Sequence, residues 1–180
     1  MTPTDSELIA RSLAESRTDA FGMLVERHQS AVRRFLRHLT RGDAALADDL
    51  AQETFIGAYR GLPRFRSDSR FETWLLGIAY HRFRSHRRRR SAEPAQAGPT
   101  AEEPSEPPAE RLTDLQQDLA SSMAGLSDDE QHALTLCFQF GLSHGEIAAA
   151  TGWPLGTVKT HITRGKGRLR ELLSVWNPKT

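Results

Sequence analysis

The side chains with the clearest chemical roles are concentrated between residues 48 and 90. Residues 48–53 form an acidic and amide run, residues 66–70 form a polar loop, and residues 71–90 combine aromatic rings with four consecutive arginines. Carboxylates and amides can bind a basic protein surface, whereas rings beside cations are the groups that hold single-stranded nucleic acid. The pattern therefore indicates one surface for a protein partner and one for nucleic acid.

These groups do not form an arrangement typical of an enzyme. Asp48 and Asp49 are adjacent, so their side chains diverge on a helix and could not easily share a metal ion. The sequence shows no cysteine–histidine zinc pattern, no glycine-rich phosphate loop and no paired carboxylates beside a basic cleft. We therefore expect no catalytic residue, no metal and no cofactor.

The net charge of +1 conceals a segregation of charge along the 180 residues. Residues 1–90 carry 17 Lys and Arg against 11 Asp and Glu (+6), residues 91–130 carry 1 against 10 (−9), and residues 131–180 carry 6 against 2 (+4). Two basic blocks around an acidic one indicate two polyanion-binding units joined by a segment that avoids polyanions. The plainer alternative is two solvated surfaces and an acidic linker.

Cysteine content and hydropathy bear on the compartment. The single cysteine, Cys137, rules out a disulfide framework within the chain and fits a reducing environment. No apolar run approaches 18 residues, so we expect no membrane insertion. Residues 1–7 lack the basic and apolar regions of a signal peptide. These features together predict a cytoplasmic protein.

Hydrophobic periodicity predicts four helices in the first half of the chain. Each prediction depends on a capping residue or a helix breaker, and the helices are expected over about residues 5–15, from Asp19 to Gly42, from Asp43 to Gly61, and over about 71–88. His28 lies on the apolar stripe of the second helix, where a structural role is favoured over a ligand role.

Opposite sides of the third and fourth predicted helices carry the functional groups. The third helix places Asp49, Gln52, Glu53 and Ile56 on one side, which is either a solvated polar face or a docking patch. On the fourth, five residues share a side on which rings and cations could hold single-stranded nucleic acid: Gly77, Tyr80, His81, Arg84 and Arg88.

Residues 91–111 are expected to form a flexible, acidic, proline-rich linker. Five of the nine prolines lie within residues 91–110, and that stretch contains no large apolar residue. Such a composition cannot bury enough surface to fold. The chain is therefore predicted to be all-α, with small helical domains at residues 1–90 and 112–180.

The second domain carries the pattern of a helix-turn-helix. Capping boxes are expected at residues 113–116, 127–130 and 143–146, and residues 151–154 form a tight break between two helices. On the last helix Val158, Ile162 and Leu169 are predicted to face inward. The residues predicted to face outward, toward base edges and phosphates, are Lys159, Thr160, Thr163 and Arg164. An ordinary helical hairpin is the alternative.

Both halves resemble a known family. Residues 48–55 (DDLAQETF) and 65–79 (FRSDSRFETWLLGIA) closely resemble region two of the extracytoplasmic-function (ECF) sigma factors, group four of the sigma-70 family. Residues 126–173, with the segments GLSHGEIA and GTVKT, resemble their region four. The resemblance implies a bacterial initiation factor, without catalytic activity, that recruits core RNA polymerase to particular promoters.

The resemblance also implies three binding surfaces. Core polymerase would bind Asp48, Asp49, Gln52, Glu53 and Ile56. The melted minus-ten strand would contact Gly61, Phe65, Arg66, Asp68, Ser69, His81, Arg84 and Arg88, with a flipped base held near Gly61 and Phe65. The duplex minus-thirty-five element would contact Thr157, Lys159, Thr160, Thr163, Arg164 and Lys166.

The sequence departs from the family pattern at one position and leaves two alternative functions open. The family usually has Asn where this chain has His81, so the preferred minus-ten base is open. The resemblance further implies control by a separate anti-sigma factor. The rivals are a stand-alone dimeric helix-turn-helix regulator of duplex DNA, which leaves the acidic face without a role, and an enzyme acting on nucleic acid.

Overall fold

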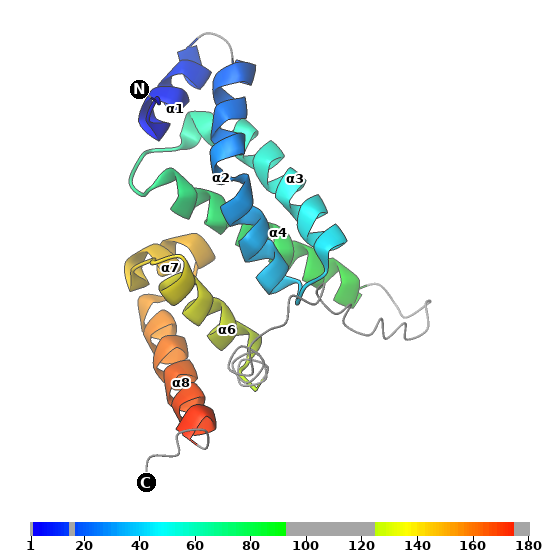
Figure 1. Cartoon of the computed structure of the whole chain (residues 1–180), viewed down its shortest axis with the longest axis vertical. Coiled ribbons are helices and arrows are strands. Elements are labelled where there is room, and N and C mark those ends of the chain that lie inside the picture. Colours follow the sequence, from blue (N-terminus) through cyan, green and yellow to red (C-terminus); the bar gives the residue numbers. More distant parts are fainter. Residues whose placement is uncertain (1, 15–16, 93–124, 175–180) are drawn as a thin grey trace. The chain divides into compact units, whose positions relative to one another are not determined.

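The computed structural model describes residues 2–14, 17–92 and 125–174. Within these ranges every regular element is a helix (Figure 1), which confirms the all-α prediction. The chain divides into two compact units, Met1–Ser105 and Glu106–Thr180, and each is described by itself. The predicted linker from residue 93 onward and the capping box at residues 113–116 lie outside the described residues, whereas residues 91 and 92, predicted to belong to the linker, are helical.

The described part of the first unit is built from helices that pack around one core. Its elements in chain order are α1 (Asp5–Ala14), α2 (Arg17–Leu39), α3 (Ala44–Gly61), the short 3-10 helix η1 (Leu62–Arg64) and α4 (Phe71–Ala92). Helix α1 packs against α2, and α2, α3 and α4 pack against one another in pairs. Figure 1 shows α2, α3 and α4 running side by side.

Local capping sets most helix boundaries in this unit. Thr4 and Glu7 satisfy each other's backbone N–H groups, at 2.7 and 3.3 Å, and so open α1. The Asp43 carboxylate accepts a hydrogen bond of 2.9 Å from the backbone N–H of Leu46 at the start of α3, as predicted. Asp19 is not the predicted cap, because α2 begins earlier, at Arg17. Asp19 lies instead in the first turn of α2, where its negative charge interacts favourably with the helix dipole.

The core of the first unit is apolar and almost fully buried from solvent. Phe35 and Leu36 of α2, Leu50 of α3, and Leu75 and Leu76 of α4 are at most 1% exposed. Burying each such side chain stabilises the fold by roughly 1.5–3 kcal/mol. Because these residues fix the inward side of each helix, they also fix which side faces solvent.

The second unit contains the predicted helix-turn-helix. Its described elements are α6 (Asp128–Leu134), the π-helical turn η2 (Thr135–Gln139), α7 (His144–Thr151) and α8 (Leu155–Ser174). Capping boxes at Ser127 with Glu130 and at Ser143 with Glu146 open α6 and α7, as predicted. Figure 1 shows α7 and α8 as consecutive helices separated by a short turn.

Glycines with positive φ shape the turns of the second unit. Gly141, at φ 65°, follows the helical segment that ends in η2, and Gly152, at φ 73°, ends α7. Only glycine adopts this left-handed conformation without a steric penalty from Cβ. The resulting turn places α8 against α6 and α7, where Val158 and Ile162 are buried.

Candidate protein-docking and nucleic-acid interfaces

Helix α3 presents the predicted docking face to solvent. Leu50 and Thr54, on its inward side, are at most 1% exposed, so the opposite side points outward. Asp49 and Gln52 are exposed there, and Ile56 is 51% exposed. An exposed isoleucine beside carboxylate and amide groups suits a partner that offers both basic and apolar side chains.

Asp48 and Glu53 are less accessible than the rest of this face. The Oδ1 atom of Asp48 lies 3.1 Å from the Nε atom of Arg33 on α2, and Arg33 also donates to the Gln29 amide oxygen at 3.1 Å. Asp48 therefore links α3 to α2, an exposed ion pair that contributes at most about 1 kcal/mol. Glu53 is half-buried.

One further exposed residue, Tyr59, enlarges the apolar part of the α3 face and was not predicted. Tyr59, one turn beyond Ile56, is 38% exposed, and its ring makes an edge contact with Phe21 of α2 at 5.1 Å between centroids. The three-residue spacing of Ile56 and Tyr59 was the signal available in the sequence.

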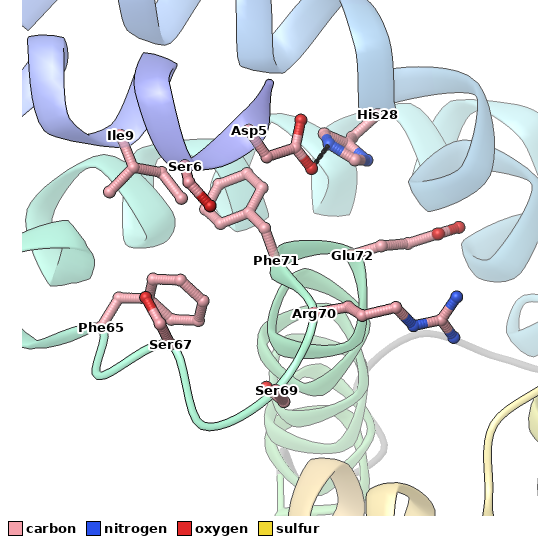
Figure 2. A pocket seen from close by; sticks show the side chains of 10 residues that line it. All are labelled: Asp5, Ser6, Ile9, His28, Phe65, Ser67, Ser69, Arg70, Phe71 and Glu72. Carbon is pink, nitrogen blue, oxygen red and sulfur yellow. Dashed lines mark hydrogen bonds and ion pairs between the residues drawn. The ribbon is translucent and has the colours of Figure 1, made fainter.

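A pocket of about 300 Å³ opens at the loop before α4 (Figure 2). The rings of Phe65 and Phe71, the hydroxyls of Ser67 and Ser69, and the first turn of α4 form one part of its lining. Helix α1 and His28 of α2 form the other part. Pockets of this size bind small ligands, and the half-buried ring of Phe65 offers a face on which a planar group can stack, whereas Phe71 is only 4% exposed.

The aromatic lining is held by ring contacts. Phe65 lies 4.9 Å from Trp74 and 5.6 Å from Phe71, measured between ring centroids, and Phe71 lies 5.6 Å from Trp74. Gly61, expected near the flipped base, is not part of the pocket lining; a Cβ at this position would lie 3.3 Å from the Trp74 ring. Gly61 therefore lets the end of α3 approach Trp74, and the ring of Trp74 packs against Phe65.

The loop between η1 and α4 exposes the predicted polar residues. Arg66 and Asp68 are exposed, and Ser69 is half-buried and lines the pocket. Ser67 has φ 59°, a left-handed conformation that is uncommon for a non-glycine residue and reverses the chain here. The reversal brings Phe65 and Ser69 to the same pocket.

Helix α4 presents a basic stripe but not the predicted tyrosine. His81, Arg84 and Arg88 are exposed at a spacing of three and four residues, so they share one side of the helix. Tyr80, expected to offer a ring to nucleic acid, is only 3% exposed, and this part of the prediction was wrong. Its helix is buried on more than one side, because it packs against both α2 and α3.

Helix α8 presents the outward face predicted for duplex binding. Lys159, Thr160, Thr163 and Arg164 are all exposed, while Thr157 is half-buried. The hydroxyl of Thr160 donates to the backbone carbonyl of Gly156 at 2.9 Å. That bond orients the hydroxyl oxygen, which keeps acceptor capacity for an external donor.

Lys166 lies on the same side as Lys159, seven residues away, but it has an aromatic neighbour. Its Nζ atom lies 5.5 Å from the centroid of Phe138 in η2, and Phe138 is 63% exposed. The Phe138–Lys166 contact was not predicted, because the two residues are 28 positions apart in the sequence.

Lys166 also affects the neighbouring thiol of Cys137. Burial raises the pKa of this thiol, and the positive charge of Lys166 opposes the increase only in part.

A buried carboxylate links α6 to α8. Glu130 is 3% exposed, and its Oε2 accepts a hydrogen bond of 2.7 Å from Arg168. Burial disfavours the charged form, but hydrogen bonds from the backbone and hydroxyl of Ser127 and the charges of Arg168 and His161 outweigh it and lower the Glu130 pKa. This network fixes the second half of α8 relative to the start of α6.

The described residues show neither a cluster of metal-binding side chains nor a helix suited to cross a membrane. Across residues 2–14, 17–92 and 125–174, His, Cys, Asp and Glu side chains form no group of three that could hold a metal ion. In the same ranges, none of the helices combines the length and the apolarity that crossing a membrane requires.

Comparison with protein families matches both units. Residues 24–93 match the family described as Sigma-70 region 2, and residues 116–169 match Sigma-70, region 4. Among curated proteins, an ECF RNA polymerase sigma factor SigC of Mycobacterium tuberculosis (strain CDC 1551 / Oshkosh) is 33% identical, with 93% of this chain and 92% of the relative covered. An ECF RNA polymerase sigma-E factor of Escherichia coli (strain K12) is 36% identical, with 91% of each covered.

Two solved structures are similar to this chain along most of its length. The sigma factor RpoE of Bartonella quintana, crystallised with the anti-sigma factor NepR, has a TM-score of 0.72 and 31% identity, and covers 86% of this chain and 97% of its own. CnrH in complex with the cytosolic domain of CnrY has a TM-score of 0.66 and 29% identity, and covers 95% and 97%.

Proposed function

Because this chain belongs to the ECF sigma factors of the sigma-70 family, we propose that separate surfaces on its two units bind core RNA polymerase and the two promoter elements. Sigma factors of this family direct promoter-specific transcription with RNA polymerase and are not enzymes. One observation carries the proposal: each matched region lies within one compact unit that exposes its own binding side chains. We assign residues 1–90 to region two, 91–111 to a linker and 112–180 to region four.

The α3 face is the surface that we assign to core polymerase. Asp49 and Gln52 would bind basic and amide groups of the partner, while Ile56 and Tyr59 would bury apolar area. These residues are exposed in the free unit, so binding requires no local unfolding. Asp48 would act by holding Arg33 and the adjoining part of α2 in register with α3.

The pocket and the α4 stripe are the surfaces that we assign to the melted minus-ten strand. A base turned out of the stack would enter between Phe65 and the polar loop, where its ring can stack. His81, Arg84 and Arg88 would follow the strand, the arginines by binding phosphates and His81 by reading a base. Stacking on Phe65 is supported by the half-buried position of its ring at the pocket.

Helix α8 is the element that we assign to the minus-thirty-five duplex. The exposed Lys159, Thr163 and Arg164 would meet base edges and phosphates in the major groove. Buried Val158 and Ile162 hold the helix from behind, so its orientation is set by the fold and not by the DNA. The similar RpoE structure is a complex with the anti-sigma factor NepR, and by analogy we propose an anti-sigma partner for this chain as well.

Run-off transcription tests the proposal directly. Purified core polymerase is incubated with fragmented genomic DNA of the source organism, with and without this protein, and transcript starts are sequenced. We expect discrete new starts that share two upstream motifs. A chain carrying Asp49→Lys and Glu53→Lys is the matched control, because it should lose the starts while its duplex-binding helix is unchanged.

The negative outcomes separate the rival functions. Absence of new starts, with core binding retained in a pull-down, would contradict a self-sufficient sigma factor and indicate a decoy or a factor that needs a co-activator. Absence of both starts and core binding, with duplex binding retained, would instead support a stand-alone regulator. Metal-dependent cleavage of the DNA would support an enzyme.

A further inference from the structure

Helix α1 precedes the matched region-two residues, 24–93, yet it forms a wall of the pocket. Asp5, Ser6 and Ile9 line the pocket from α1, on the side opposite Phe65 (Figure 2). The first turn of α1 can change the width of the pocket when it shifts, although Leu8, farther along the same helix, is fully buried in the core. The position of α1 therefore bears on what the pocket can hold.

Helix α2 anchors the start of α1 at two points. Arg27 forms an ion pair with the Asp5 carboxylate and also donates to the Pro3 carbonyl at 2.7 Å. The other carboxylate oxygen of Asp5 lies 3.0 Å from Nε2 of His28. Both oxygens of Asp5 are thus engaged by α2, so removing the carboxylate would loosen the first turn of α1 and leave the Arg27–Pro3 hydrogen bond as its remaining polar contact with that helix among the described residues.

The same carboxylate is connected to the ring at the mouth of the pocket. His28 is 8% exposed, and its ring contacts Phe71 edge-on at 5.4 Å between centroids. Phe71 in turn contacts Phe65 edge-on at 5.6 Å. Packed side chains transmit small displacements because interiors are dense. Asp5, His28, Phe71 and Phe65 therefore form one continuous series of contacts from α1 to the loop.

We propose that Asp5 is a positioning residue for promoter recognition: by holding α1 and His28 in place, it sets the width of the pocket and the orientation of Phe65 for the flipped base. The inference rests on the proposed function of this pocket. With about 300 Å³, the pocket is at the small end of ligand sites, where a shift of one wall decides whether a flat base stacks or sits loosely. Asp5 itself need not touch the base, since its oxygens are engaged by α2.

The experiment measures how much each base of a minus-ten strand contributes to binding by the complex of this protein with core polymerase. The full chain is assembled with core polymerase and titrated against the labelled non-template strand of a promoter mapped by run-off transcription. The same strand is then tested with an abasic site at each position in turn. The readout is the penalty, which is the ratio of the two dissociation constants at each position, so any general change in affinity cancels.

One position should stand out in the natural protein. Loss of a stacked base there is expected to weaken binding at least about fivefold. In Asp5→Ala the penalty at that position should fall below about twofold, while penalties elsewhere are unchanged. Asp5→Asn keeps a polar group that can still accept from Arg27 and should give an intermediate penalty. Arg11→Ala, an exposed change on α1 outside the pocket lining, should leave every penalty unchanged.

Different failures contradict different claims. If no position of the natural protein shows a penalty, the base-binding function of the pocket fails, and the inference with it. If a penalty exists and Asp5→Ala leaves it intact, the inference alone is overturned. A uniform loss at all positions would also overturn it, because that result reports a structural role. Phe65→Ala with Asp5→Ala provides a further check, since the second change should add nothing to the first.

Discussion

Gly165 of α8 lies so close to Leu134 of α6 that a Cβ at position 165 would be 2.8 Å from the Leu134 Cδ1 atom. The glycine is buried, and α8 continues through it and through Gly167 to Ser174. Glycine in a helix interior normally lowers stability. At position 165 the missing side chain is what allows α8 to pack against α6.

The two glycines of α8 should therefore respond oppositely to alanine. Gly165→Ala forces Leu134 to move and is expected to lower the free energy of unfolding by about 1–3 kcal/mol. Gly167→Ala meets no atom within 4 Å and should raise that free energy by roughly 0.5–1 kcal/mol. Calorimetry of the two full-length variants checks this, and changes of the same sign would contradict the packing role of Gly165.

Acidification should destabilise the second unit through Glu130. Its pKa is lowered in the folded unit, so the stabilisation is complete above the ordinary value of 4.5 and is lost as the pH falls through the lower folded value. Glu130→Gln should cost about 1–3 kcal/mol at neutral pH and flatten this acid dependence. Unfolding measured between pH 7 and 3 tests both effects.

The Arg168 partner provides the control for that pH profile. Arg168→Met should cost about 1–3 kcal/mol, because it leaves the buried Glu130 carboxylate without its cation while the Ser127 hydrogen bonds remain. Arg170→Met removes another exposed arginine of α8 and should leave the profile unchanged. An unaltered acid dependence in Glu130→Gln would mean that another group governs it.

Charge reversal on α3 should separate polymerase binding from DNA binding. Asp49→Lys or Glu53→Lys is expected to weaken core binding at least about tenfold through like-charge repulsion. Asp49→Lys should have the larger effect, because Asp49 is exposed and Glu53 is half-buried. Core binding is measured by titration, and duplex binding is measured on the same variants. Asp129→Lys, in the second unit, should leave core binding unchanged. If Asp49→Lys or Glu53→Lys also lost duplex binding, that result would contradict separate surfaces.

Two residues of α8 should affect duplex binding in different ways. Arg164→Ala is expected to reduce discrimination between specific and altered duplexes by about 1–3 kcal/mol if it makes a bidentate base contact. Lys166→Met should weaken all duplexes alike and reduce the salt slope by about one, as a phosphate contact would. Titrations at several salt concentrations distinguish the two, and a uniform loss in Arg164→Ala would make it a phosphate contact too.

His81→Asn restores the residue usual in the family and should change base preference without changing core binding. His81 is exposed on α4, so the exchange should not disturb the fold. Its ring makes an edge contact with Tyr80 at 5.8 Å, which the smaller amide cannot reproduce. Binding to minus-ten strands with each base at the position that His81 reads measures the effect. Identical preferences in both proteins would show that His81 does not read a base.

Much of the fold was predictable because it depends on local interactions. Asp43, Ser127 and Ser143 cap helices by bonds to backbone groups three residues away. The exposure of Asp49 and Lys159 follows from helical periodicity, which needs no knowledge of the partner helix. His28 is buried, as expected for a structural histidine on an apolar stripe. Family membership was recognisable for the same reason, since its motifs are contiguous segments.

Tertiary structure decided which side of each helix meets a neighbour. Tyr80 and His81 are adjacent on α4, yet one is buried and the other exposed, because α4 packs against two helices and a single apolar stripe does not describe it. The pairs Asp5–His28 and Glu130–Arg168 join residues 23 and 38 positions apart. Periodicity determines the side of one helix that a residue occupies, but contacts of this kind depend on how two helices cross, which no local pattern specifies.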